Sequence, residues 1–140
     1  MAPQTKPPEN IVEIARQHDK LSTFVEALFR ADVNEILESG GPYTVFAPVD
    51  SAFDALPDEQ FAQLSSADKS RLTSILKHHI VPAEVRLERI RDGQMTTLGR
   101  RPVPTAITGD EQFFGNGRIT RGNIDCNNGL IHVVDRVFIP

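Results

Sequence analysis

The chain has 140 residues, of which 39% are hydrophobic and 24% are charged, and its formal net charge is −4. A chain of this length forms one domain that buries roughly two-thirds of its unfolded surface, without needing a metal or a disulfide. The composition excludes a mainly disordered protein, and the sequence contains no apolar run near the ~20 residues of a membrane-spanning helix. A negative net charge argues against nucleic-acid binding, which needs a basic face.

The first nine residues differ in composition from the rest. They hold three prolines and no apolar stretch, so they resemble a flexible leader rather than a signal peptide. We therefore expect a leader over 1–9 and a single domain over 10–140. The one cysteine, Cys126, cannot form a disulfide within the chain and gives no indication of the compartment.

Helical spacing dominates the segment that follows. Asn10 is placed to cap a helix over 11–16. The pattern Thr23-x-x-Glu26 is typical of a capping box and predicts a second helix with apolar residues on one face. A short third helix is expected over 33–37, ending before a pair of glycines.

After the third helix, the spacing of the apolar residues changes from a helical pattern to that of a strand. Residues 43–47 are mostly β-branched and aromatic and predict a short strand closed by Pro48. Asp50 is expected to cap a short helix over 51–56. A longer helix is expected over 65–79, where the pattern Ser-x-x-Asp opens it and a proline follows it.

The last ~50 residues have the pattern of short strands separated by seven glycines. Asn116-Gly117 between 112–115 and 118–120 is a strong hairpin signal. Residues 130–139 are long enough for a central strand, with apolar side chains on both faces. Helices that precede strands favour an α+β fold over βαβ alternation.

No sequence motif of an enzyme class is present. Cys126 with His132 could form a nucleophile–base pair, because such pairs are set by space rather than by sequence. A buried core cysteine is the more economical interpretation. Asp50 and the acidic residues that follow it are explained by a helix cap and a solvated face rather than by an acid–base pair.

The histidines do not have the spacing of a metal site. His78 and His79 are adjacent and point to different faces of a helix, so only one of them could act together with His132. Two ligands are too few for a zinc site. We therefore expect no metal and no cofactor.

Two segments together resemble the signatures of fasciclin-like domains. Residues 44–53, TVFAPVDSAF, are similar to the first motif of that family, T-V-F-A-P-T-D-x-A-F. Residues 128–140, NGLIHVVDRVFIP, are similar to the second, N-G-x-I-H-x-I-D-x-V-L-x-P. Between them, residues 76–82 resemble the Tyr-His segment of the family, with His78 in the place of the tyrosine. The resemblance extends from about residue 10 to residue 140.

The resemblance implies an α+β fold in which N-terminal helices pack on a wedge of two β-sheets. It also implies a set of structural motif residues, with His79 and His132 hydrogen-bonded to the backbone or to the region of the first motif. These residues are Thr44, Pro48, Asp50, Phe53, His79, Asn128, Gly129, His132 and Asp135.

The resemblance further implies a non-enzymatic module for cell adhesion or interaction, of the small, secreted, single-domain bacterial type. We expect a monomer in an extracellular, cell-surface or periplasmic location, with its signal peptide removed. Its partner would be a protein or a glycan on a cell surface or in a matrix, bound near residues 116–125.

Four residues are candidates for interaction: Asn123, Ile124, His78 and His79. In animal members an Asp-Ile dipeptide before the second motif is implicated in integrin binding. Asn123-Ile124 stands in its place here and lacks the carboxylate, so integrin recognition is not carried over. The exchange of tyrosine for His78 also alters the second proposed adhesion epitope.

Two alternatives remain open. A small-ligand or lipid carrier would use a groove between the helices and the sheets, although the phenylalanines available to line it more economically fill a core. These are Phe24, Phe29, Phe61, Phe113 and Phe114. A hydrolase that uses Cys126 or a histidine is the third hypothesis.

Overall fold

The computed structural model describes residues 9–38, 40–55, 69–99 and 102–138. The helices are α1 (Ile11–Gln17), α2 (Ser22–Arg30), α3 (Asn34–Glu38), α4 (Asp50–Asp54), α6 (Lys69–Lys77) and the 3₁₀ helix η1 (Leu87–Arg89). The strands are β1 (Tyr43–Pro48), β2 (Ile80–Val81), β3 (Gly93–Thr96), β4 (Pro102–Thr108), β5 (Glu111–Phe114), β6 (Gly117–Cys126) and β7 (Gly129–Val134). No helix in the described ranges has both the length and the hydrophobicity to cross a membrane.

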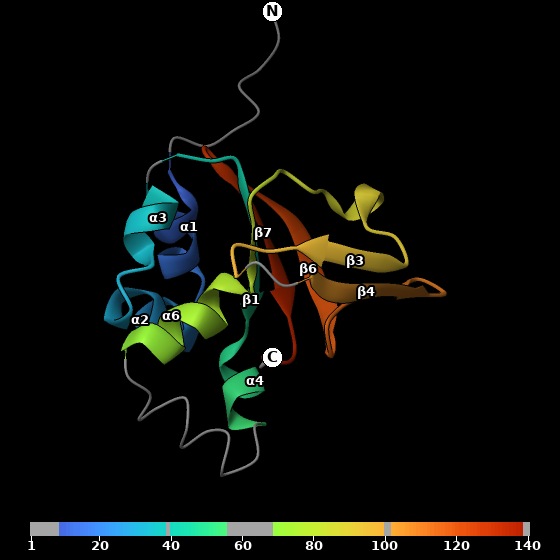
Figure 1. The fold of residues 1–140 in the computed structure, drawn as a ribbon, viewed down its shortest axis with the longest axis horizontal. Coiled ribbons are helices and arrows are strands. Elements are labelled where there is room, and N and C mark those ends of the chain that lie inside the picture. Colours follow the sequence, from blue (N-terminus) through green and yellow to red (C-terminus); the bar gives the residue numbers. More distant parts are fainter. Residues whose placement is uncertain (1–8, 39, 56–68, 100–101, 139–140) are drawn as a thin grey trace, which may run out of the picture.

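The strands are hydrogen-bonded in the order β2-β1-β7-β6-β5-β4-β3. Strand β1 runs parallel to β7, and the other pairs are antiparallel. Helices α1, α2, α3 and α6 gather on one side of β1 and β7, while β3 and β4 lie on the other side (Figure 1). The predicted α+β fold is confirmed.

The two sheets of the predicted wedge are joined through β6. Its first two residues pair with β5, and residues from Ile119 to Cys126 pair with β7, with shifts in register between them. Figure 1 shows β3 and β4 running steeply across the direction of β1 and β7. After β3, the Leu98 N–H donates to the Ile80 carbonyl at 2.8 Å. The chain that leaves β3, the last strand in the hydrogen-bonded order, therefore lies beside β2, the first strand in that order.

The described residues form two hydrophobic cores, one on each side of β1 and β7. The larger core joins the helices to Val45, Ile131 and Val133. The smaller core lies between the two arms of the wedge, where the rings of Phe46 and Phe114 stack with centroids 3.9 Å apart. Every residue of β7 is buried, as the apolar side chains on both of its faces predict.

The caps of the first two helices are formed differently. Asn10 caps α1 as predicted, in a reciprocal capping box with Glu13. The predicted box at Thr23 and Glu26 is wrong, because α2 begins at Ser22 and its N-cap residue has no side-chain hydrogen bond. The missing cap is supplied from another element, as described below.

The prediction that Asp50 caps the helix that follows it is also wrong. Helix α4 begins at Asp50 itself, and the preceding Val49 gives no side-chain cap. Residue 50 is therefore inside the first turn of α4, and its carboxylate points to the start of α2 instead.

Other expectations hold with shifted boundaries. The third helix begins one residue later than predicted, and the last strand ends at Val134 rather than at 139. The hairpin between β5 and β6 is present, but its two turn residues are Gly115 and Asn116, and Gly115 has φ of +61°.

Some expectations fall outside the described residues: most of the leader, the end of the 51–56 helix, the start of the 65–79 helix, and Phe61. The last predicted leader residue, Glu9, contacts the domain, since its carbonyl accepts a hydrogen bond from the Asn127 N–H at 2.8 Å.

Gly129 provides a test of the strand pairing. A Cβ there would lie 1.9 Å from the Tyr43 carbonyl oxygen, and φ is +155°. We expect Gly129→Ala to lower the free energy of unfolding by more than about 3 kcal/mol or to prevent folding.

The matched control is Gly109→Ala, where φ is +61° but nothing lies within 4 Å of the added Cβ. Backbone strain alone should cost that variant about 1 kcal/mol. Urea unfolding measures both, and equal losses in the two variants would contradict the proposed overlap at Gly129.

Candidate functional site

The two sequence motifs meet at one edge of the sheet. The parallel register pairs Thr44 with Leu130 and Pro48 with Val134, so both strands end at the same edge. Because β6 is antiparallel to β7, it begins at this edge. The start of α4 and the end of the second motif therefore lie beside the first residues of β6.

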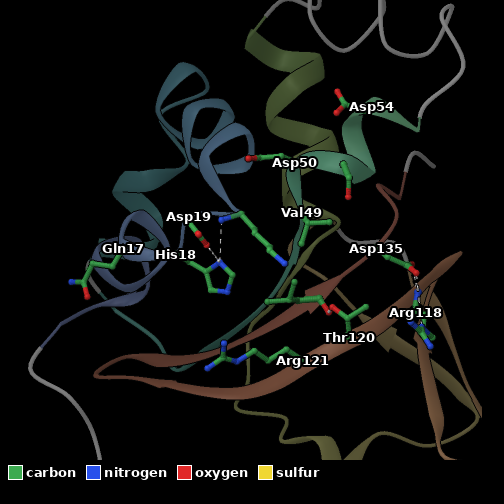
Figure 2. Close-up of a pocket in the computed structure, with 13 residues that line it drawn as sticks. Gln17, His18, Asp19, Val49, Asp50, Asp54, Arg118, Thr120, Arg121 and Asp135 are labelled. Atoms are coloured by element: carbon green, nitrogen blue, oxygen red, sulfur yellow. Dashed lines mark hydrogen bonds and ion pairs between the residues drawn. The ribbon is translucent and has the colours of Figure 1, made fainter.

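A groove of about 960 Å³ lies at this edge (Figure 2). Its walls come from the end of α1 and the turn after it, the start of α4, β6, and the end of β7. The lining residues are mostly polar or charged: Gln17, His18, Asp19, Lys20, Val49, Asp50, Ser51, Asp54, Arg118, Thr120, Arg121, Val133 and Asp135.

Asp50 joins one wall of the groove to another. Its carboxylate accepts hydrogen bonds from the Thr23 N–H at 2.8 Å and from the Ser22 hydroxyl at 2.9 Å. Its own N–H donates to the Lys20 carbonyl at 2.8 Å. Burial raises the pKa of Asp50, but the hydrogen bonds from Thr23 and Ser22 outweigh it and hold the pKa below its ordinary value. The first motif thus caps α2.

Asp135 closes the opposite wall. Its carboxylate accepts a hydrogen bond from the Arg118 N–H at 2.7 Å, and its other oxygen lies 3.9 Å from the Arg118 guanidinium. That guanidinium also pairs with Glu111 at 2.7 Å. The charges of Asp135 and Arg118 are therefore largely compensated within the domain (Figure 2).

Other charges in the groove are not compensated in this way. Lys20, Asp54 and Arg121 are exposed, and no hydrogen bond or ion pair joins their side chains to any described residue. Figure 2 shows Arg121 and His18 at one end of the groove and Asp135 with Arg118 at the other. The groove thus offers charged groups of both signs to a partner.

His79, which does not line the groove, is held by two backbone groups. The Phe138 N–H donates to its Nε2 at 3.0 Å, so Nδ1 carries the proton and donates to the Ile75 carbonyl at 3.0 Å. Burial lowers the pKa of the His79 imidazole to about 4, although the hydrogen bond to Ile75 acts in the opposite direction. The imidazole is therefore neutral at pH 7 and links α6 to the segment after β7.

His132 is likewise held by two backbone groups, and it links β7 to the segment that contains Val85. The Asn123 N–H donates to its Nδ1 at 3.0 Å, and Nε2–H donates to the Val85 carbonyl at 2.7 Å. Burial also lowers the pKa of this imidazole. The predicted bonding of both histidines to the backbone is thus present in the structure.

The comparisons with known proteins agree with this geometry. The sequence profile of the Fasciclin domain matches residues 19–140. The chain belongs to the fasciclin domain family.

Two relatives illustrate the spread of the family. The chain is 33% identical over 131 residues to protein sll1483 of Synechocystis, which covers 93% of this chain and 73% of that protein. It is 32% identical over 134 residues to the cell surface glycolipoprotein MPB83 of Mycobacterium bovis, covering 93% of this chain and 60% of that protein.

A solved structure shows the same fold. The FAS1 domain pair of the insect cell adhesion molecule fasciclin I superposes with a TM-score of 0.75, covering 96% of this chain and 52% of that chain. The sequence identity is 16%, so this likeness concerns the fold alone.

The remaining motif residues of this fasciclin domain also have structural contacts. The Thr44 hydroxyl donates to the Ala83 carbonyl at 2.6 Å and accepts from the Val85 N–H at 2.8 Å. The Asn128 side chain joins the end of α3 to the start of α1, through the Leu37 carbonyl at 2.6 Å and the Ile11 N–H at 3.0 Å.

Pro48 and Phe53 lie on either side of the turn into α4 and are both buried. Phe53 is part of the larger core. The two motifs of this fasciclin domain therefore hold distant segments together.

The candidate interaction residues lie in two places. His78 and His79 are 3% and 1% exposed, so their side chains are not presented to a partner while the domain is folded. Asn123 has φ of +55°, accepts from the Leu87 N–H at 2.9 Å and donates to Glu88 at 2.8 Å. Ile124 is half-buried against the larger core. A role of Asn123 and Ile124 in binding stays a prediction.

The structure separates the residues of the alternative hypotheses. Cys126 is fully buried in the larger core, whereas both ring nitrogens of His132 are occupied by backbone groups on the other face of β7. They form no nucleophile–base pair. Within the described ranges, no three His, Cys, Asp or Glu side chains are grouped as metal ligands.

The described phenylalanines among those proposed to line a ligand groove do not share one. Phe24 lies in the larger core, Phe114 lies in the smaller core, and Phe29 is 40% exposed beneath the Arg16 guanidinium. The groove at the strand ends is lined mostly by polar or charged residues, and none of these phenylalanines lines it. Sequence reasoning missed Lys20, and it included Arg121 only as part of the face near 116–125, because no periodicity or motif marks charged residues that line one groove only in the folded chain.

The cap formed by Asp50 can be tested directly. We expect Asp50→Ala to lower the free energy of unfolding by about 1–2 kcal/mol, because it leaves the Thr23 N–H at the start of α2 without its acceptor. Asp54→Ala, on the exposed part of the same helix, should change it by less than about 0.5 kcal/mol. Urea unfolding at pH 7 measures both, and equal effects would contradict the cap.

The buried histidines predict a pH dependence. The unfolded chain takes up a proton at the ordinary histidine pKa of 6.5, but folded His79 does so only at about 4. Stability is therefore full above pH 6.5 and falls as the pH drops toward 4, with a contribution from His79 of about 3 kcal/mol. Unfolding free energies measured across that interval check the slope.

His79→Ala should lower stability at pH 7 by roughly 1–3 kcal/mol, because two buried backbone groups lose their partner, and should flatten the pH slope. A slope that is unchanged in this variant would show that His79 is not its source.

Proposed function

We propose that this fasciclin domain is a non-enzymatic adhesion or interaction module that acts outside the cytoplasm as a monomer. It binds a protein or a glycan on a cell surface or in a matrix. The relatives support this proposal, since MPB83 is named a cell surface glycolipoprotein and fasciclin I is described as a cell adhesion molecule.

The observation that carries the proposal is the groove at the meeting point of the two motifs. It is open, most of its lining residues are polar or charged, and its β6 wall is made by Arg118, Thr120 and Arg121. The titratable groups that could serve catalysis, Cys126 and the imidazole of His132, are instead buried in structural roles.

The β6 wall coincides with the predicted interaction face near residues 116–125. Arg121 is exposed there and has no ion-pair partner among the described residues. Asn123, in the same strand, holds the segment around Leu87 against β6. We therefore place the contact surface on the groove side of β6.

Attachment of cells to surfaces coated with the domain tests the proposal. Cells of the producing organism and of a second cell type should attach to the folded domain and not to a coat of heat-unfolded protein. Arg121→Glu should weaken attachment about tenfold, which corresponds to about 1.4 kcal/mol. Arg89→Glu, an exposed arginine in η1 away from the groove, should leave it unchanged.

No attachment to the folded domain above the bare surface would contradict the adhesion function. Attachment that Arg121→Glu and Arg89→Glu reduce equally would contradict the placement of the contact surface on the groove.

A further inference from the structure

The hydrogen-bonded order of strands has two ends, and they differ in exposure. At one end, both residues of β2 are buried, and the Ile80 carbonyl accepts a hydrogen bond from the Leu98 N–H at 2.8 Å. At the other end, every residue of β3 is exposed except Met95, which is half-buried. Figure 1 shows β3 on the side of the domain away from the helices. Within the described part of the chain, β3 is therefore an open edge strand.

The backbone of β4 indicates which groups of β3 face the open edge. The Pro104 carbonyl accepts a hydrogen bond from the Gly115 N–H at 2.7 Å, so this carbonyl points toward the end of β5. The Ile107 N–H donates to the Asp92 carboxylate at 2.8 Å, on the β3 side, as the alternation along a strand requires. Gln94 lies opposite Pro104 in the register, so the N–H and C=O of Gln94 point away from β4.

Thr96 faces the edge in the same way. It lies opposite Pro102, and a proline has no N–H to donate to β3. Outside the β3–β4 pair, no described residue forms a backbone hydrogen bond with Gln94 or Thr96. The open edge thus presents the N–H and C=O groups of two residues at the two-residue spacing of a strand.

The side chains of β3 differ between the two faces of the sheet. Met95 packs against the smaller core, so the side chains of Gln94 and Thr96 lie on the opposite face. None of the side chains of β3 is charged, and the strand contains no proline, although proteins commonly protect an edge strand with charges or prolines. A strand added beside β3 would place apolar side chains next to Met95 and polar ones next to Gln94 and Thr96.

We propose that the open edge of β3 binds an extended segment of a partner protein as an added antiparallel strand. A polypeptide backbone presents N–H and C=O groups at the same spacing as β3, whereas a glycan has no such repeat. The matching segment alternates apolar residues with uncharged polar ones. This surface is separate from the groove, whose lining includes no residue of β3. The inference goes beyond the proposed function and does not depend on it.

A peptide titration followed by the amide NMR signals of the domain tests the inference. The probe is Lys-Thr-Val-Thr-Val-Thr-Lys with blocked ends, in which the valines suit Met95 and the threonines suit Gln94 and Thr96. Few hydrogen bonds join two such strands, so the titration extends to about 1 mM peptide. We expect the amide signals of Gln94 and Thr96 to shift and their hydrogen exchange to slow, while the amides of β2 are unaffected.

Two N-methylated forms of the probe separate strand pairing from other modes of binding. Methyl groups on the threonine nitrogens remove the N–H groups that face β3, and they should weaken binding at least about tenfold. Methyl groups on the valine nitrogens lie on the far edge of the added strand and should change binding much less.

Two variants of the domain test the same pairing from the other side. Thr96→Pro removes an N–H that faces the edge and leaves the pairing with β4 in place, because edge strands tolerate proline. It should weaken binding about three- to tenfold, which is the effect of one hydrogen bond. Thr96→Val keeps the N–H and a side chain of the same shape, so this control should bind like the unchanged protein. Should Thr96→Pro not fold, the methylated probes decide.

The inference is overturned if no amide of β3 shifts at the highest peptide concentration, or if the two methylated probes bind equally well. Equal binding by the folded Thr96→Pro and Thr96→Val variants would overturn it as well. Shifts of the β3 amides that depend on protein concentration without peptide would assign the edge to a second copy of this chain instead. Each of these results leaves the proposed adhesion function standing, because that function is tested by the attachment of cells.

Discussion

The parallel pairing of β1 with β7 is the contact on which the rest of the domain depends. It joins residues 86 positions apart in the sequence, from Tyr43 opposite Gly129 to Pro48 opposite Val134. Loop closure over that distance is costly in entropy, so the pair must be stabilised on both faces. The helices cover one face with the larger core, and the other arm of the wedge covers the second face with the Phe46–Phe114 stack.

The polar side chains of the two motifs then hold the surrounding segments to this pair. Thr44 and His132 both bind the backbone near Val85, His79 binds the segment after β7, and Asp50 caps α2. Each of these buried or half-buried groups has its partners satisfied, which avoids the cost of an orphaned polar group. The groove forms where the two strands end. The groups available to a partner are the exposed charged side chains that line the groove.

The sequence was informative wherever local chemistry determines the structure. It predicted the α+β class, the cap at Asn10, the last strand buried on both faces and a hairpin whose turn lies one residue earlier than the predicted Asn116-Gly117, because each follows from short-range patterns. It failed where a side chain acts across the fold. Asp50 looks like a local cap in the sequence, but its carboxylate binds Thr23, 27 positions away. Likewise, Lys20 and Arg121 line one groove only once α1 and β6 are in place, and no spacing rule describes that arrangement.

Native-state hydrogen exchange tests the central role of the β1–β7 pair most directly. The account predicts that amides along both strands, such as those of Val45, Phe46 and Val133, exchange only through global unfolding and share one opening free energy. That value should equal the free energy of unfolding measured with urea, while amides of the exposed β3 strand open at lower cost. If β1 and β7 exchange through separate local openings well below the global value, the pair is not the contact on which the fold depends.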